Sequence, residues 1–160
     1  MKIALAQVNP IIANFSHNNE RIRQCVDQAI AQSCDLVIFS ELVISGYPPQ
    51  DLVEKKDFVD ANVASLNRML DTIRGIGVIC GFVDHNPADE GKRVCNSAVL
   101  FEDGQIRHQV QKRLLPTYDV FDESRYFEPG RESRSFLYKG MRIGLTICED
   151  LWNDKDIFKR

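Results

Sequence analysis

The sequence lacks a long apolar run and a strong excess of one charge. Its first ten residues, MKIALAQVNP, are interrupted by Gln7 and Asn9, so this stretch is too short for a signal-peptide core or a membrane span. The 160 residues carry a net charge of −3, and their basic doublets are scattered. This balance favours neither a nucleic-acid nor a membrane partner, and we expect a cytoplasmic protein.

The sequence also lacks the spacing of a disulfide framework or a zinc site. Its five cysteines include no CxxC pair, and its three histidines are far from zinc-ligand spacing. We therefore predict no metal site. Cys25 and Cys80 fall in apolar patterns, where thiols usually pack as small hydrophobic side chains.

Strand and helix patterns alternate along the chain, which predicts an α/β fold. Short apolar stretches predict strands at 2–9, 35–41, 76–84, 96–105, 106–113, 135–140 and 141–148. The turn sequence EDGQ joins two of these strands as a hairpin. A long polar loop, 114–134, precedes the last two.

Two helices are predicted from apolar side chains at helical spacing. The first runs from about Ser16 to Gln32, with Ser16 or Asn18 as N-cap. Its apolar positions are Ile22, Val26, Ala29 and Ile30, and those of the second are Phe58, Leu66, Met69, Leu70 and Ile73. Between them, SGYPPQD must form a loop, because two consecutive prolines fit neither a helix nor a central strand.

Reactive side chains follow three of the predicted strands. Glu41 ends DLVIFSE, Lys112 follows IRHQVQ, and Cys148 follows RIGLTI. Functional groups gather where rigid strands end in loops. Two acids, Glu149 and Asp150, follow the cysteine and disfavour its thiolate. If Lys112 lies nearby, its ammonium offsets them, while Glu41 can accept the thiol proton.

Each of these three residues also has an ordinary structural interpretation. A glutamate or lysine at a strand end is usually solvated, and a lone cysteine in an apolar run is usually packing. Residue type and placement strengthen the combined case, but spacing alone leaves the alternatives open.

Three longer blocks resemble a known family. FSELVISGYPPQDL, KRLLPTYDVFDESRYFEPG and GLTICEDLW are similar to the catalytic blocks of the nitrilase superfamily of carbon-nitrogen hydrolases, whose Glu-Lys-Cys triad cleaves C–N bonds. The variants GYPPQDL, LPTYDVFDE and ICEDLW most resemble the glutamine amidotransferase (glutaminase) domain of glutamine-dependent NAD synthetases. The resemblance covers essentially the whole chain.

The resemblance implies roles for eight residues. The catalytic positions fall on Glu41, Lys112, Cys148 and Glu123, and the glutamine-binding positions fall on Tyr47, Tyr118, Phe121 and Glu149. It implies that the glutamine side-chain amide is hydrolysed through a cysteine thioester without a cofactor. The ammonia then serves the ATP-dependent amidation of deamido-NAD, in a synthetase domain that uses ATP and Mg.

The resemblance also implies a fold and a domain organisation. We expect a nitrilase-like four-layer α-β-β-α sandwich, incomplete at its C-terminal end. Residues 1–160 would be the N-terminal part of the glutaminase domain, with the synthetase domain absent from these residues. Gly75-Ile76-Gly77 is a turn before a strand and not a phosphate-binding loop. Family members pair their subunits, so a homo-oligomer is expected.

Three other functions remain open from the sequence. The chain could be a stand-alone amidase of the nitrilase type, or an inert piece with a binding or assembly role. The third is a Cys-His hydrolase with His108 as base, which its position in the middle of a predicted strand disfavours. His85, in the segment DHNPADEG, is interpreted as a surface residue.

Overall fold

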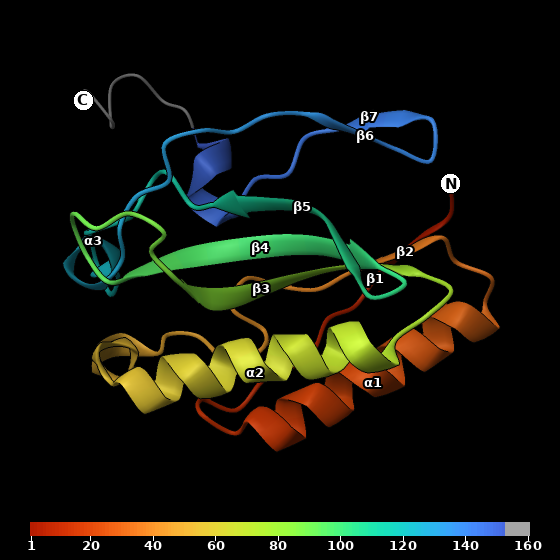
Figure 1. Ribbon diagram of the computed structural model, residues 1–160, viewed down its shortest axis with the longest axis horizontal. Helices are drawn as coiled ribbons and strands as arrows, with labels where there is room; N and C mark the ends of the chain where they lie inside the picture. Colours follow the sequence, from red (N-terminus) through yellow and green to blue (C-terminus); the bar gives the residue numbers. More distant parts are fainter. Residues whose placement is uncertain (153–160) are drawn as a thin grey trace.

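A five-stranded sheet forms the centre of the computed structural model, which describes residues 1–152 (Figure 1). Its strands lie in the order β1 (Ile3–Leu5), β2 (Leu36–Ile38), β3 (Gly77–His85), β4 (Val94–Glu102) and β5 (Gln105–Gln111). The first three are parallel, and β4 is antiparallel to both of its neighbours. The α/β prediction is confirmed.

Two long helices, α1 (Phe15–Ala31) and α2 (Lys56–Thr72), cover one face of this sheet (Figure 1). Both match the predicted helices. Their apolar faces pack on the strands in one core cluster, which contains Ile22, Val26, Leu66 and Met69 with Val37 and Val78. No helix within residues 1–152 is long and apolar enough to cross a bilayer.

The predicted start of α1 was wrong in detail. Its N-cap is Asn14, whose side chain accepts a hydrogen bond from the backbone N–H of His17, and not Ser16 or Asn18. Asn18 is buried and donates to the carbonyls of Ile11 and Ile44. It therefore anchors the segment that follows β2. Ile30, expected on the apolar face, is exposed.

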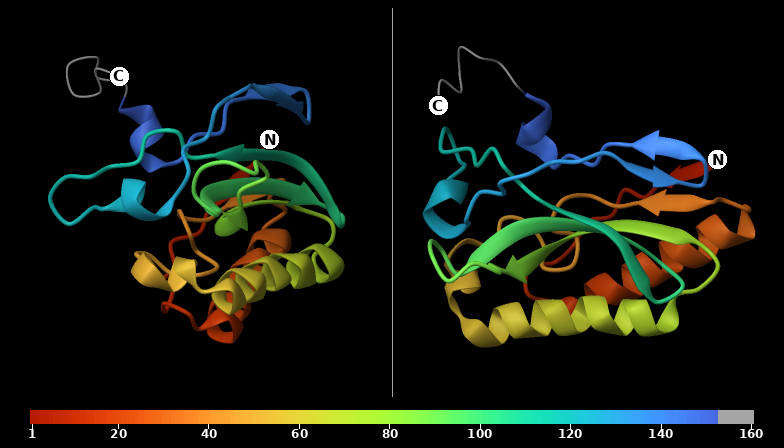
Figure 2. Two further views of the ribbon diagram at one scale, coloured as in Figure 1. Left: turned by 60° about the vertical axis from the view of Figure 1, so that its left-hand side comes forward. Right: turned by 45° about the horizontal axis from the view of Figure 1, so that its top comes forward.

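The opposite face of the sheet carries a hairpin of β6 (Phe136–Tyr138) and β7 (Met141–Ile143) (Figure 2). Tyr138 packs there against Leu36, Ile79 and Leu100. The described residues thus form a helix layer, a sheet and a second strand layer, which is the layer order expected of the first part of an α-β-β-α sandwich.

Several predicted strands are shorter than expected. The last ends at Ile143, where its register partner Phe136 begins β6, so the ladder extends no further in the described residues. Cys148 instead opens a short 3-10 helix, η2 (Cys148–Leu151). The loop 114–134 contains a helical turn, α3 (Glu123–Tyr126), and η1 (Gln50–Glu54) follows the proline loop.

The predicted EDGQ hairpin between β4 and β5 is confirmed. Asp103 has a φ of 52° and Gly104 a φ of 80°. Two positive φ values in a two-residue turn match the twist of the flanking antiparallel strands. This turn directs β5 back along β4 and brings Lys112 to the same end of the sheet as Asn96, whose carbonyl accepts the backbone N–H of Lys112 at 2.8 Å.

Candidate active site

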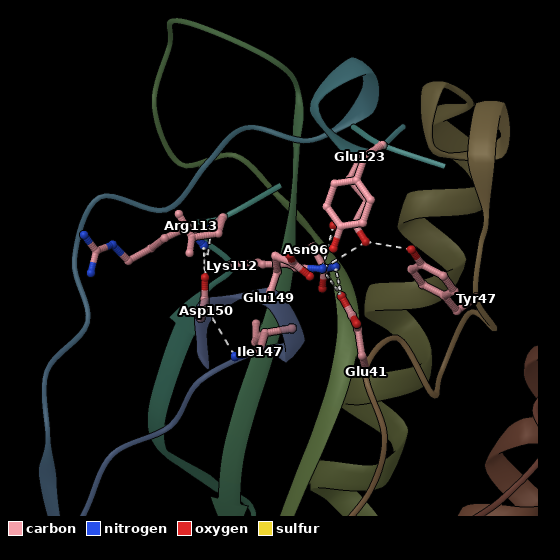
Figure 3. Close-up of polar contacts among 11 residues, drawn as sticks. Glu41, Tyr47, Asn96, Lys112, Arg113, Glu123, Ile147, Glu149 and Asp150 are labelled. Atoms are coloured by element: carbon pink, nitrogen blue, oxygen red, sulfur yellow. Dashed lines mark hydrogen bonds and ion pairs between the residues drawn. The ribbon is translucent and has the colours of Figure 1, made fainter. Parts of the chain in front are cut away.

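Four side chains, two carboxylates, one ammonium and one amide, come from separate segments of the chain and meet at one end of the sheet (Figure 3). The Lys112 Nζ donates to Glu41 Oε1 at 2.8 Å and to Glu123 Oε1 at 2.9 Å. Asn96 Nδ2 donates to the same Glu41 oxygen at 2.6 Å. The structure therefore brings together side chains that lie 71 positions apart in the sequence, as Glu41 and Lys112 do.

Glu41 is held in a tight turn after β2. The next residue, Leu42, has a φ of 47°, and the turn rests directly on Gly81 of β3. A methyl group on Gly81 would lie 2.9 Å from Glu41 Cα and would clash with the Leu42 backbone nitrogen. Because glycine has no side chain, the Glu41 turn can pack onto the centre of the sheet.

Lys112 is completely buried at the end of β5. Burial favours its neutral form and so lowers its pKa, but the negative charges of Glu41 and Glu123 outweigh this effect and raise the pKa above its usual value. Lys112 is therefore an ammonium at neutral pH. Its carbonyl accepts the backbone N–H of Gly130 at 2.8 Å, which fixes the strand end.

Glu123 begins α3 and is 5% exposed. Burial raises its pKa, and the Lys112 ammonium opposes that rise. The Tyr47 hydroxyl donates to Glu123 Oε1 at 2.8 Å. Burial and this bond to an acid raise the pKa of Tyr47, so the phenol stays a donor. Lys112 is thus clamped between two carboxylates, each with a second donor.

The expected glutamine-binding residues form a connected group beside this cluster. The Tyr118 hydroxyl donates to Glu149 Oε1 at 2.7 Å. The Phe121 ring lies between the rings of Tyr118 and Tyr47, with centroids 5.6 Å and 6.4 Å away. A cavity of about 190 Å³ is lined in part by Tyr47, Phe121 and Glu123, on the Tyr47 side of this group. The four predicted pocket residues therefore lie together.

Cys148 is exposed and has a φ of 43°, in the left-handed region that favours glycine. Partial desolvation contributes most to raising the pKa of its thiol, and the charge of Glu41 contributes next, while Lys112 lowers this pKa. Lys112 contributes more than the neighbouring acid Glu149 and so offsets it as expected, but the expectation that the thiolate is favoured overall is wrong. Lys112 acts in the expected direction, but desolvation and Glu41 outweigh it.

Asp150 has a structural task that the sequence did not reveal. Its Oδ1 accepts the backbone N–H groups of Arg113 and Leu114, both at 2.9 Å, and its Oδ2 accepts the backbone N–H of Ile147 at 3.2 Å. Arg113 and Leu114 directly follow Lys112, and Ile147 directly precedes Cys148. The carboxylate thus joins the two segments that carry the ammonium and the thiol (Figure 3).

Asn96 was also not among the site residues predicted from the sequence. It is fully buried in β4 and contacts both Glu41 and the Lys112 backbone. A signal was available, because an amide inside the apolar run VCNSAVLF requires a hydrogen-bonding partner when it is buried. The strand pattern gave no indication of which partner that would be.

The two histidines weighed earlier lie elsewhere. The His108 ring stacks on Phe136 at 4.1 Å between centroids, and burial lowers its pKa. His85 is exposed and lies 3.2 Å from Asp60, as expected of a surface residue. In residues 1–152 no cluster of three or more histidine, cysteine, aspartate or glutamate side chains is arranged to hold a metal ion.

A family model described as carbon-nitrogen hydrolase matches residues 2–159. The chain belongs to this carbon-nitrogen hydrolase family. A glutamine-dependent NAD(+) synthetase of Synechocystis sp. is 45% identical over 96% of this chain and 28% of its own length. The glutamine-dependent NAD+ synthetase structure from Acinetobacter baumannii has a TM-score of 0.88 at 35% identity, covering 98% of this chain and 29% of that one.

The nitrilase-like fold is confirmed by a second structure. An amidase of the nitrilase superfamily from Nesterenkonia has a TM-score of 0.80 at 24% identity, over 95% of this chain and 57% of that one. Similarity at this identity concerns the fold alone. The carbon-nitrogen hydrolase chain described here spans about 28% of the length of its Synechocystis relative.

Proposed function

We propose that the chain hydrolyses the side-chain amide of glutamine through a Cys148 thioester. The observation that carries this proposal is the buried Lys112 ammonium held between Glu41 and Glu123 beside the Cys148 turn. The similarity to glutamine-dependent NAD synthetases over nearly the whole chain supports glutamine as the substrate.

The first step of the proposed reaction must overcome the raised pKa of the Cys148 thiol. Since the thiol is mostly protonated at neutral pH, a base must take its proton as sulfur attacks the amide carbon. Glu41 accepts that proton. The Lys112 ammonium and the backbone N–H of Glu149 stabilise the negative charge that develops on the amide oxygen.

The same carboxylate completes both halves of the reaction. Glu41 returns its proton to the amide nitrogen as the C–N bond breaks, and ammonia leaves a glutamyl thioester on Cys148. Glu41 then removes a proton from water, which attacks the thioester and releases glutamate, and Glu41 passes that proton to the departing sulfur to restore the thiol. Glu123 holds Lys112 in place throughout, and no cofactor takes part.

The substrate pocket is proposed to recognise the free amino-acid end of glutamine. Glu149 supplies a carboxylate for the α-ammonium, and charge-assisted hydrogen bonds of this kind are strong. Tyr118 orients that carboxylate through its hydroxyl. The rings of Tyr47 and Phe121 provide an apolar wall for the substrate methylenes.

The wider function is proposed from the relatives. Ammonia would amidate deamido-NAD in a synthetase domain that uses ATP and Mg, in a cytoplasmic homo-oligomer. Residues 1–160 would then be the N-terminal part of the glutaminase domain. A division of labour between two sites predicts that only glutamine use depends on Cys148.

The test is Cys148→Ala in the protein as its gene encodes it, with Cys25→Ala as a control in α1. We expect the variant to release no glutamate from glutamine yet to form NAD from free ammonia at a near-normal rate. Equal loss of both activities in a folded protein would contradict the proposal. Turnover of simple amides without turnover of glutamine would indicate a stand-alone amidase. A protein that does not bind glutamine at all would indicate an inert role.

A further inference from the structure

The two oxygens of the Glu41 carboxylate have different surroundings. Asn96 Nδ2 and Lys112 Nζ both donate to Oε1, at 2.6 Å and 2.8 Å. Within residues 1–152 neither side chain hydrogen-bonds Oε2, and the Glu41 side chain keeps 18% of its surface exposed. One oxygen is therefore engaged by two donors, while the other accepts no hydrogen bond from the described residues.

Asn96 is well placed to enforce this difference. It is fully buried in β4, between β3 and β5, so its side chain has little freedom. Its own carbonyl accepts the backbone N–H of Lys112 at 2.8 Å. One residue thus sets the direction of the Glu41 carboxylate and the position of the strand end that carries Lys112.

We propose that Asn96 is a positioning residue that holds Glu41 by Oε1 and so assigns proton transfer to Oε2. In this scheme Oε2 takes the proton of the Cys148 thiol as the S–C bond forms. It then gives that proton to the amide nitrogen as the C–N bond breaks. Oε1 stays hydrogen-bonded to Asn96 and Lys112 throughout. The inference rests on the function proposed above.

The experiment compares two substrates that differ in their leaving group, using Asn96→Leu in the complete protein. Glutamine loses ammonia, which must be protonated to leave, whereas the p-nitrophenyl ester of the glutamate side chain loses a stable anion. We expect kcat on glutamine to fall about 100-fold, the scale of a general acid–base contribution. KM should change little, and kcat on the ester should fall several times less.

The matched control is Asn62→Leu in α2. Asn62 is as buried as Asn96, and its Nδ2 donates to the Val83 carbonyl at 2.6 Å. Within residues 1–152 the Oδ1 atoms of both asparagines lack a partner, so both substitutions remove a buried amide of the same kind. The control should lower the melting temperature without changing the ratio of the two activities.

The outcomes separate the two proposals. If the unsubstituted protein releases no glutamate from glutamine, the proposed function fails. If it does, but Asn96→Leu lowers both activities equally, then Asn96 is only structural and the assignment of Oε2 is wrong. Asn96→Ser, which is smaller and cannot reach Oε1, provides the same comparison if Asn96→Leu does not fold.

Discussion

At the scale of single residues, the site combines charges that oppose one another. Burial of Lys112 is costly for an ammonium, and Glu41 and Glu123 compensate by raising its pKa. The same Glu41 charge raises the pKa of the Cys148 thiol. The acid beside the cysteine in sequence, Glu149, contributes less than Glu41 does. Spatial neighbours therefore control the thiol more than chain neighbours do.

Lys112→Met should raise the thiol pKa further, because it removes a cation that lowers it. Alkylation of Cys148 by iodoacetamide needs the thiolate, so its rate at pH 7.5 should fall several-fold. Peptide mass spectrometry across a pH series measures this rate. Lys139→Met, on the hairpin, is the control. Superimposable pH profiles would show that the lysine charge is screened.

At the scale of elements, the site depends on how loops are tied to strand ends. Asp150 bonds the backbone on both sides of the site, after Lys112 and before Cys148. Hydrogen bonds to a charged acceptor are stronger than neutral ones. Asp150, an acid two positions after Cys148 in the sequence, thus also fixes the turn that carries Cys148.

Asp150→Ala should lower kcat about 10-fold to 100-fold with a smaller change in KM, because small displacements of catalytic groups are costly. The backbone amides of Arg113 and Leu114 should also exchange hydrogen faster, which mass spectrometry can measure. Asp150→Asn retains one acceptor oxygen, so its kcat and its exchange rates should lie between those of the unsubstituted protein and those of Asp150→Ala. Asp71→Ala, exposed on α2, should change neither quantity. Unchanged exchange with full activity would show that Asp150 does not join these segments.

At the scale of the whole molecule, the two faces of the sheet differ in how well they are covered. Ala4 packs against the helix-side core, while its neighbours Ile3 and Leu5 are 44% and 75% exposed. Leu137, on the hairpin, is 72% exposed. Alternation along β1 places Ile3 and Leu5 on the face away from the helices. An exposed apolar face beside an edge strand favours association.

We expect the 160-residue chain alone to have a mass in light scattering above its 18.3 kDa, at micromolar concentration. Leu5→Lys should shift it toward the monomer, because a buried ammonium in the contact is unfavourable. Ile30→Lys tests an apolar residue that is exposed on the helix side and should leave the mass unchanged. A monomer without any substitution would contradict this expectation.

The sequence by itself determined the class of fold and the family. Helical spacing identified α1 and α2, and apolar stretches with turn residues identified the sheet strands, because these patterns depend on local geometry alone. The three family blocks carried the candidate residues Glu41, Lys112 and Cys148. The sequence overestimated the strand before Cys148, since the length of a strand depends on a neighbour to pair with.

Only the tertiary structure decided which atoms meet. Glu41 and Lys112 are 71 positions apart, and their contact depends on the order of strands and on the absence of a side chain at Gly81. Asn96 and Asp150 became visible as site residues only through their partners. A hydrogen bond joins specific atoms at a specific distance. Periodicity in a sequence indicates which side chains are buried and which way they face, but it does not show how close two separate segments lie in space.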